Sequence, residues 1–198
     1  MATSGQSNLS GPERRTSGVS DRRPSASHGG APVRDALEAD MAAVRDIYAH
    51  YVLHSLATFE ETAPTREDML ARRRASVDLG LPYLVAEVGG VISGFAYAGL
   101  YRSRPAYRHT IEDSVYVADG FGGKGIGSAL LGELIARCER GPWRQMVAIV
   151  GDSANSASIA LHRRFGFELV GTLRSVGLKH GRWVDTPILQ RALATGGA

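Results

Sequence analysis

The feature that most constrains this chain is a predicted strand that runs into a glycine-rich loop and then into a helix. Residues 112–117 have the pattern of a buried strand around Val115, Tyr116 and Val117. Glycines follow at positions 122, 123, 125 and 127, before a run of good helix formers. A helix that begins in this way presents several free backbone N–H groups at its positive end, which is a geometry that binds anions and phosphates in particular.

Two common nucleotide motifs do not fit this loop. A P-loop needs a glycine where this chain has Ala118, and a serine or threonine where it has Gly125. A dinucleotide fingerprint that starts at Gly125 ends on Leu130, which is too large for the close-packed third glycine site. The residues of the loop alone leave two interpretations, a pyrophosphate-binding loop of another kind or a glycine-rich turn without a ligand.

A second informative segment covers residues 155–167, with the sequence NSASIALHRRFGF. Ile159, Leu161 and Phe165 form one apolar side of a predicted helix, and Gly166 allows a tight exit into the following strand.

Together these segments resemble the GNAT superfamily of acetyltransferases. Residues 122–127 resemble its pyrophosphate loop, Gln/Arg-x-x-Gly-x-Gly/Ala, at every place but the first, where Gly122 replaces the usual Gln or Arg. Residues 155–167 resemble its motif Asn-x-x-Ala/Ser-x-x-Leu-Tyr/His-x-x-x-Gly-Phe. The resemblance implies the GNAT fold, an α/β (α+β layered) domain whose mixed central sheet is flanked by helices.

The resemblance also implies acetyl-CoA as the acetyl donor, with no metal. The residues that match the two motifs and the preceding strand would hold it: Val115, Tyr116, Val117, Gly122, Gly123, Lys124, Gly125, Ile126, Gly127, Ser128, Asn155 and Ser158.

Within the superfamily, residues 32–192 look like the phosphinothricin acetyltransferase branch. That branch acetylates the α-amino group of phosphinothricin, methionine sulfoximine or methionine sulfone, and it acts as a homodimer. The resemblance rests on the segments 59–60, 101–108, 112–117, 155–167 and 181–185. It implies a substrate pocket formed by Phe59, Arg102, Ser103, Arg104 and Tyr107, of which the arginines suit the oxygens of an anionic substrate.

The expected chemistry is direct transfer to an amine, which must first lose a proton to a base. Glu112, at the start of the strand beside the cofactor, is the candidate base. A backbone N–H of residues 115–117 would stabilise the oxyanion. His162 stands where most of the superfamily has a tyrosine, and it is a candidate donor of a proton to the leaving thiolate, with a packing role as the alternative.

Composition predicts a single domain after a leader. Residues 1–30 are rich in Ser, Gly, Arg and Pro, and we expect a disordered N-terminal leader there, with one domain over residues 31–198. The leader supplies +2 of the net charge of +3, so the remaining +1 gives no reason to expect a nucleic-acid substrate. No apolar stretch is long enough to span a membrane. The single cysteine, Cys138, fits a packed thiol and a cytoplasmic location.

The remaining elements follow from periodicity and turn signals. We expect a helix capped by Asp40 with an apolar face that includes Tyr51, and a second helix capped by Thr65 that exposes Arg72–Arg74. Gly89-Gly90 predicts a hairpin. Further expected elements are strands over 32–34, 83–87, 91–100, 110–117, 143–150, 167–176 and 183–189, and helices over 128–140 and from Ser153 or Asn155 to Arg164.

Two alternatives to a small-molecule acetyltransferase remain open at the level of sequence. One is acetylation of a protein or peptide, at its N-terminus or at lysine. The other is a non-catalytic module that binds CoA, against which the presence of Glu112 argues. His50 and His54 are four residues apart, but Tyr51 replaces the glutamate of a catalytic zinc motif, so we expect no metal site there.

Overall fold

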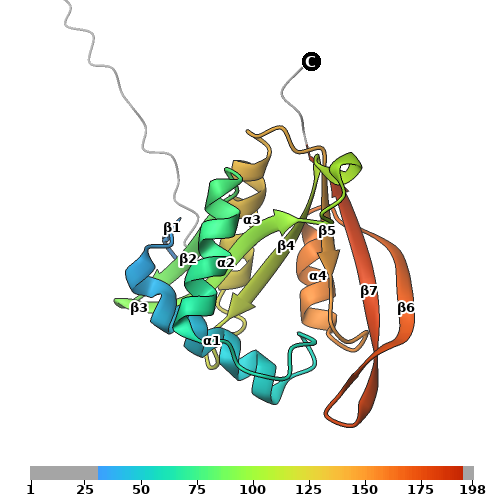
Figure 1. Cartoon of the computed structure of the whole chain (residues 1–198). Helices are drawn as coiled ribbons and strands as arrows, with labels where there is room; N and C mark the ends of the chain where they lie inside the picture. Colours follow the sequence, from blue (N-terminus) through green and yellow to red (C-terminus); the bar gives the residue numbers. More distant parts are fainter. Residues whose placement is uncertain (1–30, 194–198) are drawn as a thin grey trace, which may run out of the picture.

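The computed structural model describes residues 31–193, whose strands form one mixed seven-stranded sheet with helices on both faces (Figure 1). The predicted leader, residues 1–30, lies outside the described residues. Two short 3₁₀ turns accompany the main elements, which are β1 (Val33–Asp35), α1 (Met41–His54), α2 (Arg66–Asp78), β2 (Tyr83–Val88), β3 (Val91–Leu100), β4 (Thr110–Val117), α3 (Ile126–Cys138), β5 (Gln145–Ile149), α4 (Ser156–Arg164), β6 (Glu168–Lys179) and β7 (Arg182–Ala192).

The strand order across the sheet is β1-β2-β3-β4-β5-β7-β6. All neighbouring pairs are antiparallel except β4 and β5, which are parallel. The helix α3 connects these two strands, as a parallel crossover requires. The predicted hairpin is present between β2 and β3, and both of its glycines, Gly89 and Gly90, have positive φ.

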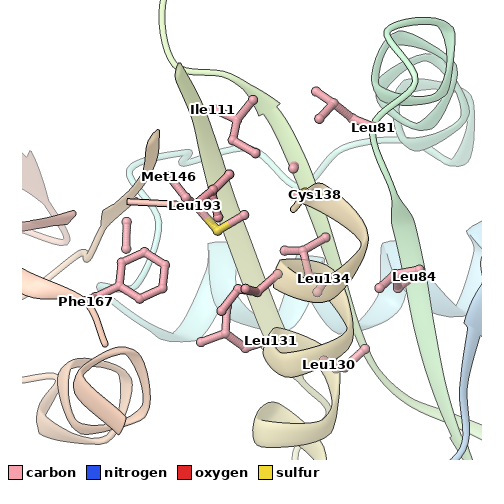
Figure 2. Packing of buried hydrophobic residues seen from close by; sticks show 14 of the residues in the cluster. Leu81, Leu84, Ile111, Leu130, Leu131, Leu134, Cys138, Met146, Phe167 and Leu193 are labelled. Atoms are coloured by element: carbon pink, nitrogen blue, oxygen red, sulfur yellow. The ribbon is translucent and has the colours of Figure 1, made fainter. Parts of the chain in front are cut away.

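Helices cover both faces of the sheet because its strands bury residues on both sides. In β2, Leu84 and Ala86 belong to the core under α3, whereas Tyr83 and Val85 belong to the core under α1 and α2. Leu130, Leu131 and Leu134 of α3 fill the first core (Figure 2), and the apolar side of α4 packs against it. The predicted layered α/β architecture is therefore confirmed.

The two parallel strands separate part-way along their length. In the register of β4 with β5, Asp113 opposite Ala148 is the final pair. Beyond it, β4 continues through residues 114–117 beside β3 alone, while β5 ends at Ile149. The two strands thus diverge at their carboxyl ends, where ligands commonly bind in sheets of this type.

Several predicted boundaries are corrected by tertiary structure. Helix α3 begins at Ile126 rather than at residue 128, because Gly125 in the left-handed region is its N-cap. Asp40 is the N-cap residue of α1 as predicted, but its carboxylate makes no capping bond to that helix: it accepts from the backbone N–H of Leu37 and pairs with Arg34 instead. Strand β6 extends to Lys179, since its hairpin with β7 stays paired beyond an irregularity in register.

Candidate active site

A cleft of about 590 Å³ opens where β4 and β5 diverge. Its walls are the carboxyl ends of these two strands and the N-terminal parts of α3 and α4. Two helix N-termini therefore meet one cavity, and their combined partial positive charge favours an anionic ligand. The cleft is suited to a cofactor that has phosphate groups at one end and an elongated arm, which would lie between the strands.

The glycine-rich loop forms the end of the cleft at α3. Gly123 and Gly125 adopt φ of +73° and +79°, a region in which a side chain is strained. A Cβ at either position, or at Gly122, would meet no atom within 4 Å, so the loop keeps an uncovered side. These residues fit the pyrophosphate of acetyl-CoA, because a cradle of uncovered amides at a helix N-terminus is the arrangement that phosphate needs.

The start of α4 forms the opposite wall. Asn155 is its N-cap, and the side-chain Oδ1 accepts a hydrogen bond of 3.2 Å from the backbone N–H of Ser158. Gly127 of α3 lies close to α4, since a Cβ there would come within 3.3 Å of Leu161. The two helices consequently converge on the cleft from one face of the sheet.

The neighbours of Glu112 on β4, Ile111 and Asp113, point to the face of the sheet that α3 covers. Because side chains alternate along a strand, Glu112 points to the opposite face, which α1 and α2 cover. The residue opposite it on β3 is Gly99, which leaves open space beside the carboxyl group. Burial raises the pKa of Glu112 to about 7, and the charge of Asp113 adds to this rise while that of Arg102 opposes it. A half-buried carboxyl with this pKa can accept a proton near neutral pH.

His162 of α4 and Asp113 of β4 form a buried pair in the wall of the cleft. The Nε2 atom of His162 lies 2.9 Å from Oδ2 of Asp113, and Nδ1 lies 2.8 Å from the backbone oxygen of Ser158. Burial acts to lower the pKa of His162, but the hydrogen bond and charge of Asp113, with the carbonyl of Ser158, raise it above its usual range.

Comparisons with known proteins agree with this geometry. The model of the acetyltransferase (GNAT) family matches residues 43–167. The chain is similar to phosphinothricin N-acetyltransferase of Alcaligenes faecalis, at 53% identity over 83% of each chain. It is 41% identical to L-methionine sulfoximine/L-methionine sulfone acetyltransferase of Salmonella typhimurium, over 81% of this chain and 94% of that one. A phosphinothricin acetyltransferase of Sinorhizobium meliloti in complex with acetyl-CoA superposes with a TM-score of 0.79, at 47% identity over 82% of this chain and 88% of that one.

The chain belongs to the acetyltransferase (GNAT) family. Within it, the similarity is to the phosphinothricin and methionine sulfoximine branch, as the sequence motifs predicted. The expected GNAT fold and the expected activity of an N-acetyltransferase are confirmed. Acetyl-CoA as the donor is confirmed at the level of the family, since a similar structure contains it.

Most residues predicted to hold the cofactor of this GNAT enzyme do line the cleft. The exception is Lys124, whose Nζ donates to the backbone oxygen of Gly120 and lies over the ring of Phe121. The other eleven are in the cleft wall, namely Val115, Tyr116, Val117, Gly122, Gly123, Gly125, Ile126, Gly127, Ser128, Asn155 and Ser158. Their contact with acetyl-CoA stays a prediction.

The residues predicted to bind the acceptor lie outside the cleft wall. Arg102, Ser103, Arg104 and Tyr107 are in the exposed connection between β3 and β4, and the guanidinium of Arg102 lies over the ring of Tyr101. Phe59 lies elsewhere, against β6, where a Cβ at Gly177 would come within 2.1 Å of its ring. The charge of Arg102 acts on the carboxyl of Glu112, but the structure gives no contact between Phe59 and the arginines.

Sequence reasoning missed the residues that hold the segment around Phe59. Lys179 is only 1% exposed, and its Nζ donates to the backbone oxygen of Thr58 at 2.6 Å. Arg72, expected on a solvated face, instead pairs with Glu60 at 2.8 Å and stacks over the ring of Tyr48. These contacts join residues from four separate elements, and no local sequence pattern signals them.

Other predictions concern groups away from the cleft. Cys138 is buried as expected, and burial raises the pKa of its thiol to about 12. Within residues 31–193, no three His, Cys, Asp or Glu side chains are grouped so that they could hold a metal ion. Over the same residues, no helix is both long enough and apolar enough to cross a membrane.

Proposed function

We propose that this enzyme transfers the acetyl group of acetyl-CoA to the α-amino group of a small amino acid of the phosphinothricin, methionine sulfoximine or methionine sulfone type, with Glu112 as the base. The observation that carries the proposal is the half-buried carboxyl of Glu112, whose pKa is raised to about 7, on the strand that also lines the cleft. The names of the two similar curated proteins support the substrate class.

Glu112 would take a proton from the substrate ammonium, directly or through one water molecule. An α-amino group has a pKa of about 8 in a chain terminus, so most of the substrate arrives protonated at neutral pH. Once the amine is neutral, its nitrogen lone pair can attack the thioester carbonyl. No covalent intermediate on the protein is required, because both reactants can be held side by side.

The backbone of β4 would stabilise the oxyanion, and a side chain of α4 would protonate the leaving thiolate. Beyond Asp113 the strand β4 is no longer paired with β5, so an N–H of residues 115–117 is available to the oxyanion. His162 would then supply the proton that the leaving thiolate needs. Arg102 and Arg104 would bind the carboxylate and the head group of the substrate, for which their forked donors are suited.

The test is a measurement of thiol release from acetyl-CoA. Phosphinothricin, methionine sulfoximine, methionine sulfone and methionine are each compared with a lysine-rich peptide. Saturable activity on the first three substrates, absent with the peptide, is the expected result. Activity on the peptide alone would replace the proposal by protein acetylation, and bound but unconsumed acetyl-CoA with every amine would replace it by a non-catalytic module.

We further propose that two copies of the chain associate through the edge strand β6. β6 is the last strand in the sheet order, and it exposes several large apolar side chains. Val170 is 61% exposed and Trp183, on the paired strand β7, is 67% exposed. The others are Leu169, Leu173, Val176 and Leu178. A second copy would cover this face, as the family resemblance implies.

Light scattering on the full chain tests this association. The expected molar mass is that of a dimer, and Val170→Glu should lower it towards that of a monomer because a charge cannot be buried there without cost. Val91→Glu is the matched control, since Val91 is 56% exposed on the β2–β3 hairpin. A monomeric wild-type protein would refute the proposal. A cytoplasmic location stays a prediction.

A further inference from the structure

The buried pair of Asp113 and His162 is the strongest unexplained feature of the cleft wall. The side chains are 1% and 6% exposed, and both residues line the cavity. The second carboxylate oxygen of Asp113, Oδ1, is buried and has no hydrogen-bond partner among residues 31–193. A buried carboxylate with an unsatisfied oxygen costs stability, and a catalytic role is one physical reason for keeping such a group.

The contacts of His162 indicate the protonation state of its imidazole ring. Nδ1 faces a backbone oxygen, which can only accept, so Nδ1 carries a proton. Nε2 faces the carboxylate of Asp113, which accepts when ionised, so Nε2 carries a proton as well. A neutral imidazole has one N–H, so with Asp113 ionised the two contacts together correspond to the imidazolium form of His162.

One hydroxyl group connects this imidazolium with the cleft. Oγ of Ser158 lies 3.4 Å from Nδ1 of His162, and Ser158 is itself part of the cleft wall. The serine is one helical turn before His162 on α4, so the two side chains lie on the same side of the helix.

We propose that Asp113 is a positioning residue that holds His162 as an imidazolium, and that the hydroxyl of Ser158 passes the Nδ1 proton of His162 to the leaving thiolate. As the carbon–sulfur bond breaks, its electron pair stays on sulfur, which takes the hydroxyl proton of Ser158. Oγ of Ser158 takes the Nδ1 proton in turn. His162 is left neutral, with its Nε2 proton still donated to Asp113. The lone pair on Nδ1 then faces the backbone oxygen of Ser158, which is unfavourable, so Nδ1 regains a proton from water after product release.

The other groups around the pair do not take the place of Asp113 as the partner of the His162 ring. Glu112 is its neighbour on β4, but the side chain of Glu112 lies on the opposite face of the sheet. From α3, the thiol of Cys138 interacts with Asp113 and stays neutral, because burial raises its pKa to about 12. Just before β6, the ring of Phe167 meets that of His162 edge-on, with 5.1 Å between the ring centroids, and it carries no charge.

The first experiment measures the protonation of His162 directly, and it rests on no assay of the proposed function. Protein with ¹⁵N-labelled histidine is titrated by NMR, with His162→Gln used to assign the ring signals. The expected result is an imidazolium that persists above the pH at which free histidine titrates, near about 6.5. In Asp113→Asn, which keeps the size of the side chain, His162 should titrate at lower pH. A neutral His162 in the wild-type protein at pH 6.5 would overturn the proposal.

The second experiment follows the pH dependence of kcat with the best amino-acid substrate. In Asp113→Asn the fall of kcat at alkaline pH should begin at lower pH, with kcat at pH 8.5 reduced about 10-fold to 100-fold. Ser158→Ala should lower kcat about 10-fold without moving that fall, since the backbone oxygen that orients His162 remains. Ser156→Ala, an exposed position at the start of α4, is the matched control.

Two outcomes separate this inference from the proposed function on which it rests. An unshifted kcat profile in Asp113→Asn, with normal turnover in the wild type, would overturn the role of Asp113 and leave the proposed function intact. Absence of turnover with every amino acid would remove the proposed function, and the NMR titration would still decide how His162 is held. If Asp113→Asn does not fold, the titration of the wild-type protein decides alone.

Discussion

Replacing Glu112 by glutamine should make the enzyme slower and the protein more stable. The substitution removes the ionisable group while keeping its size and most of its contacts. Because the carboxyl is half-buried, its ionised form is disfavoured in the folded protein, and the pKa rises from 4.5 to about 7. The same burial that would let Glu112 act as a base at neutral pH therefore also costs stability once the group is ionised.

The magnitude follows from this rise in pKa. Between pH 4.5 and 7 the folded state holds a proton that the unfolded chain has released, so the free energy of unfolding falls as pH increases through this window. Each unit of pKa corresponds to about 1.4 kcal/mol. Partial contact with solvent reduces the total, and we expect Glu112→Gln to be more stable by about 1–3 kcal/mol at pH 8, with the difference vanishing as pH falls towards 4.5.

Two assays on the same variant test both consequences. Urea unfolding at pH 5 and at pH 8 measures the stability difference, and thiol release measures turnover. Loss of a general base should lower kcat about 10²-fold to 10⁴-fold while the KM for acetyl-CoA stays within about twofold. In the wild-type enzyme, kcat/KM for the amine should rise with pH through about 7, the pKa of Glu112.

The control variant is Glu67→Gln, which removes an exposed carboxylate whose side chain is 76% accessible. It should change stability by less than about 0.5 kcal/mol and leave kcat as it is. Unimpaired turnover in Glu112→Gln would refute the assignment of the base. A stability difference that is the same at pH 5 and pH 8 would refute the electrostatic reasoning.

Three further substitutions test how the structure positions the site. Lys179→Met removes the donor that holds the segment before Phe59. It should lower the free energy of unfolding by about 1–3 kcal/mol and raise the KM of the amine more than that of acetyl-CoA. An unchanged free energy of unfolding together with an unchanged amine KM would contradict this. Gly177→Ala places a Cβ against the ring of Phe59, so it should raise the amine KM without affecting the KM of acetyl-CoA in steady-state assays. Gly125→Ala forces a side chain into a φ of +79° and should cost about 1–2 kcal/mol in urea unfolding, whereas Gly122→Ala, at ordinary φ, should cost little.

The cofactor side of the enzyme was predictable because its motifs are local. In the loop from Gly122 to Gly127, glycines at fixed spacing permit positive φ and expose amides, and these properties belong to a few consecutive residues. The same holds for Asn155, whose capping role depends on the residue three positions later. The helix start at Ile126 was misjudged by two residues, since glycines before a helix obscure which of them is its cap.

The surroundings of Phe59, which is predicted to bind the acceptor, were less predictable because they are assembled from distant segments. Phe59, Lys179 and Arg72 come together from a loop, a hairpin and a helix, and nothing near any of them in sequence indicates the others. The arginine-rich helix α2 looked solvated because three consecutive basic residues normally are, yet its Arg72 is drawn onto Tyr48 by the ion pair with Glu60.

By itself the sequence determined the order of the elements, the family and the loop that suits pyrophosphate, since each depends on residues close together along the chain. Only the tertiary structure decided that Asp113 faces His162, which is 49 residues away, and that the carboxyl of Glu112 lies on the other face of the same strand. Adjacent residues of a strand point to opposite sides of a sheet, so the neighbours Glu112 and Asp113 lie on different faces of it. Which of the two residues points towards α3 depends on how the helices pack against each face of the sheet.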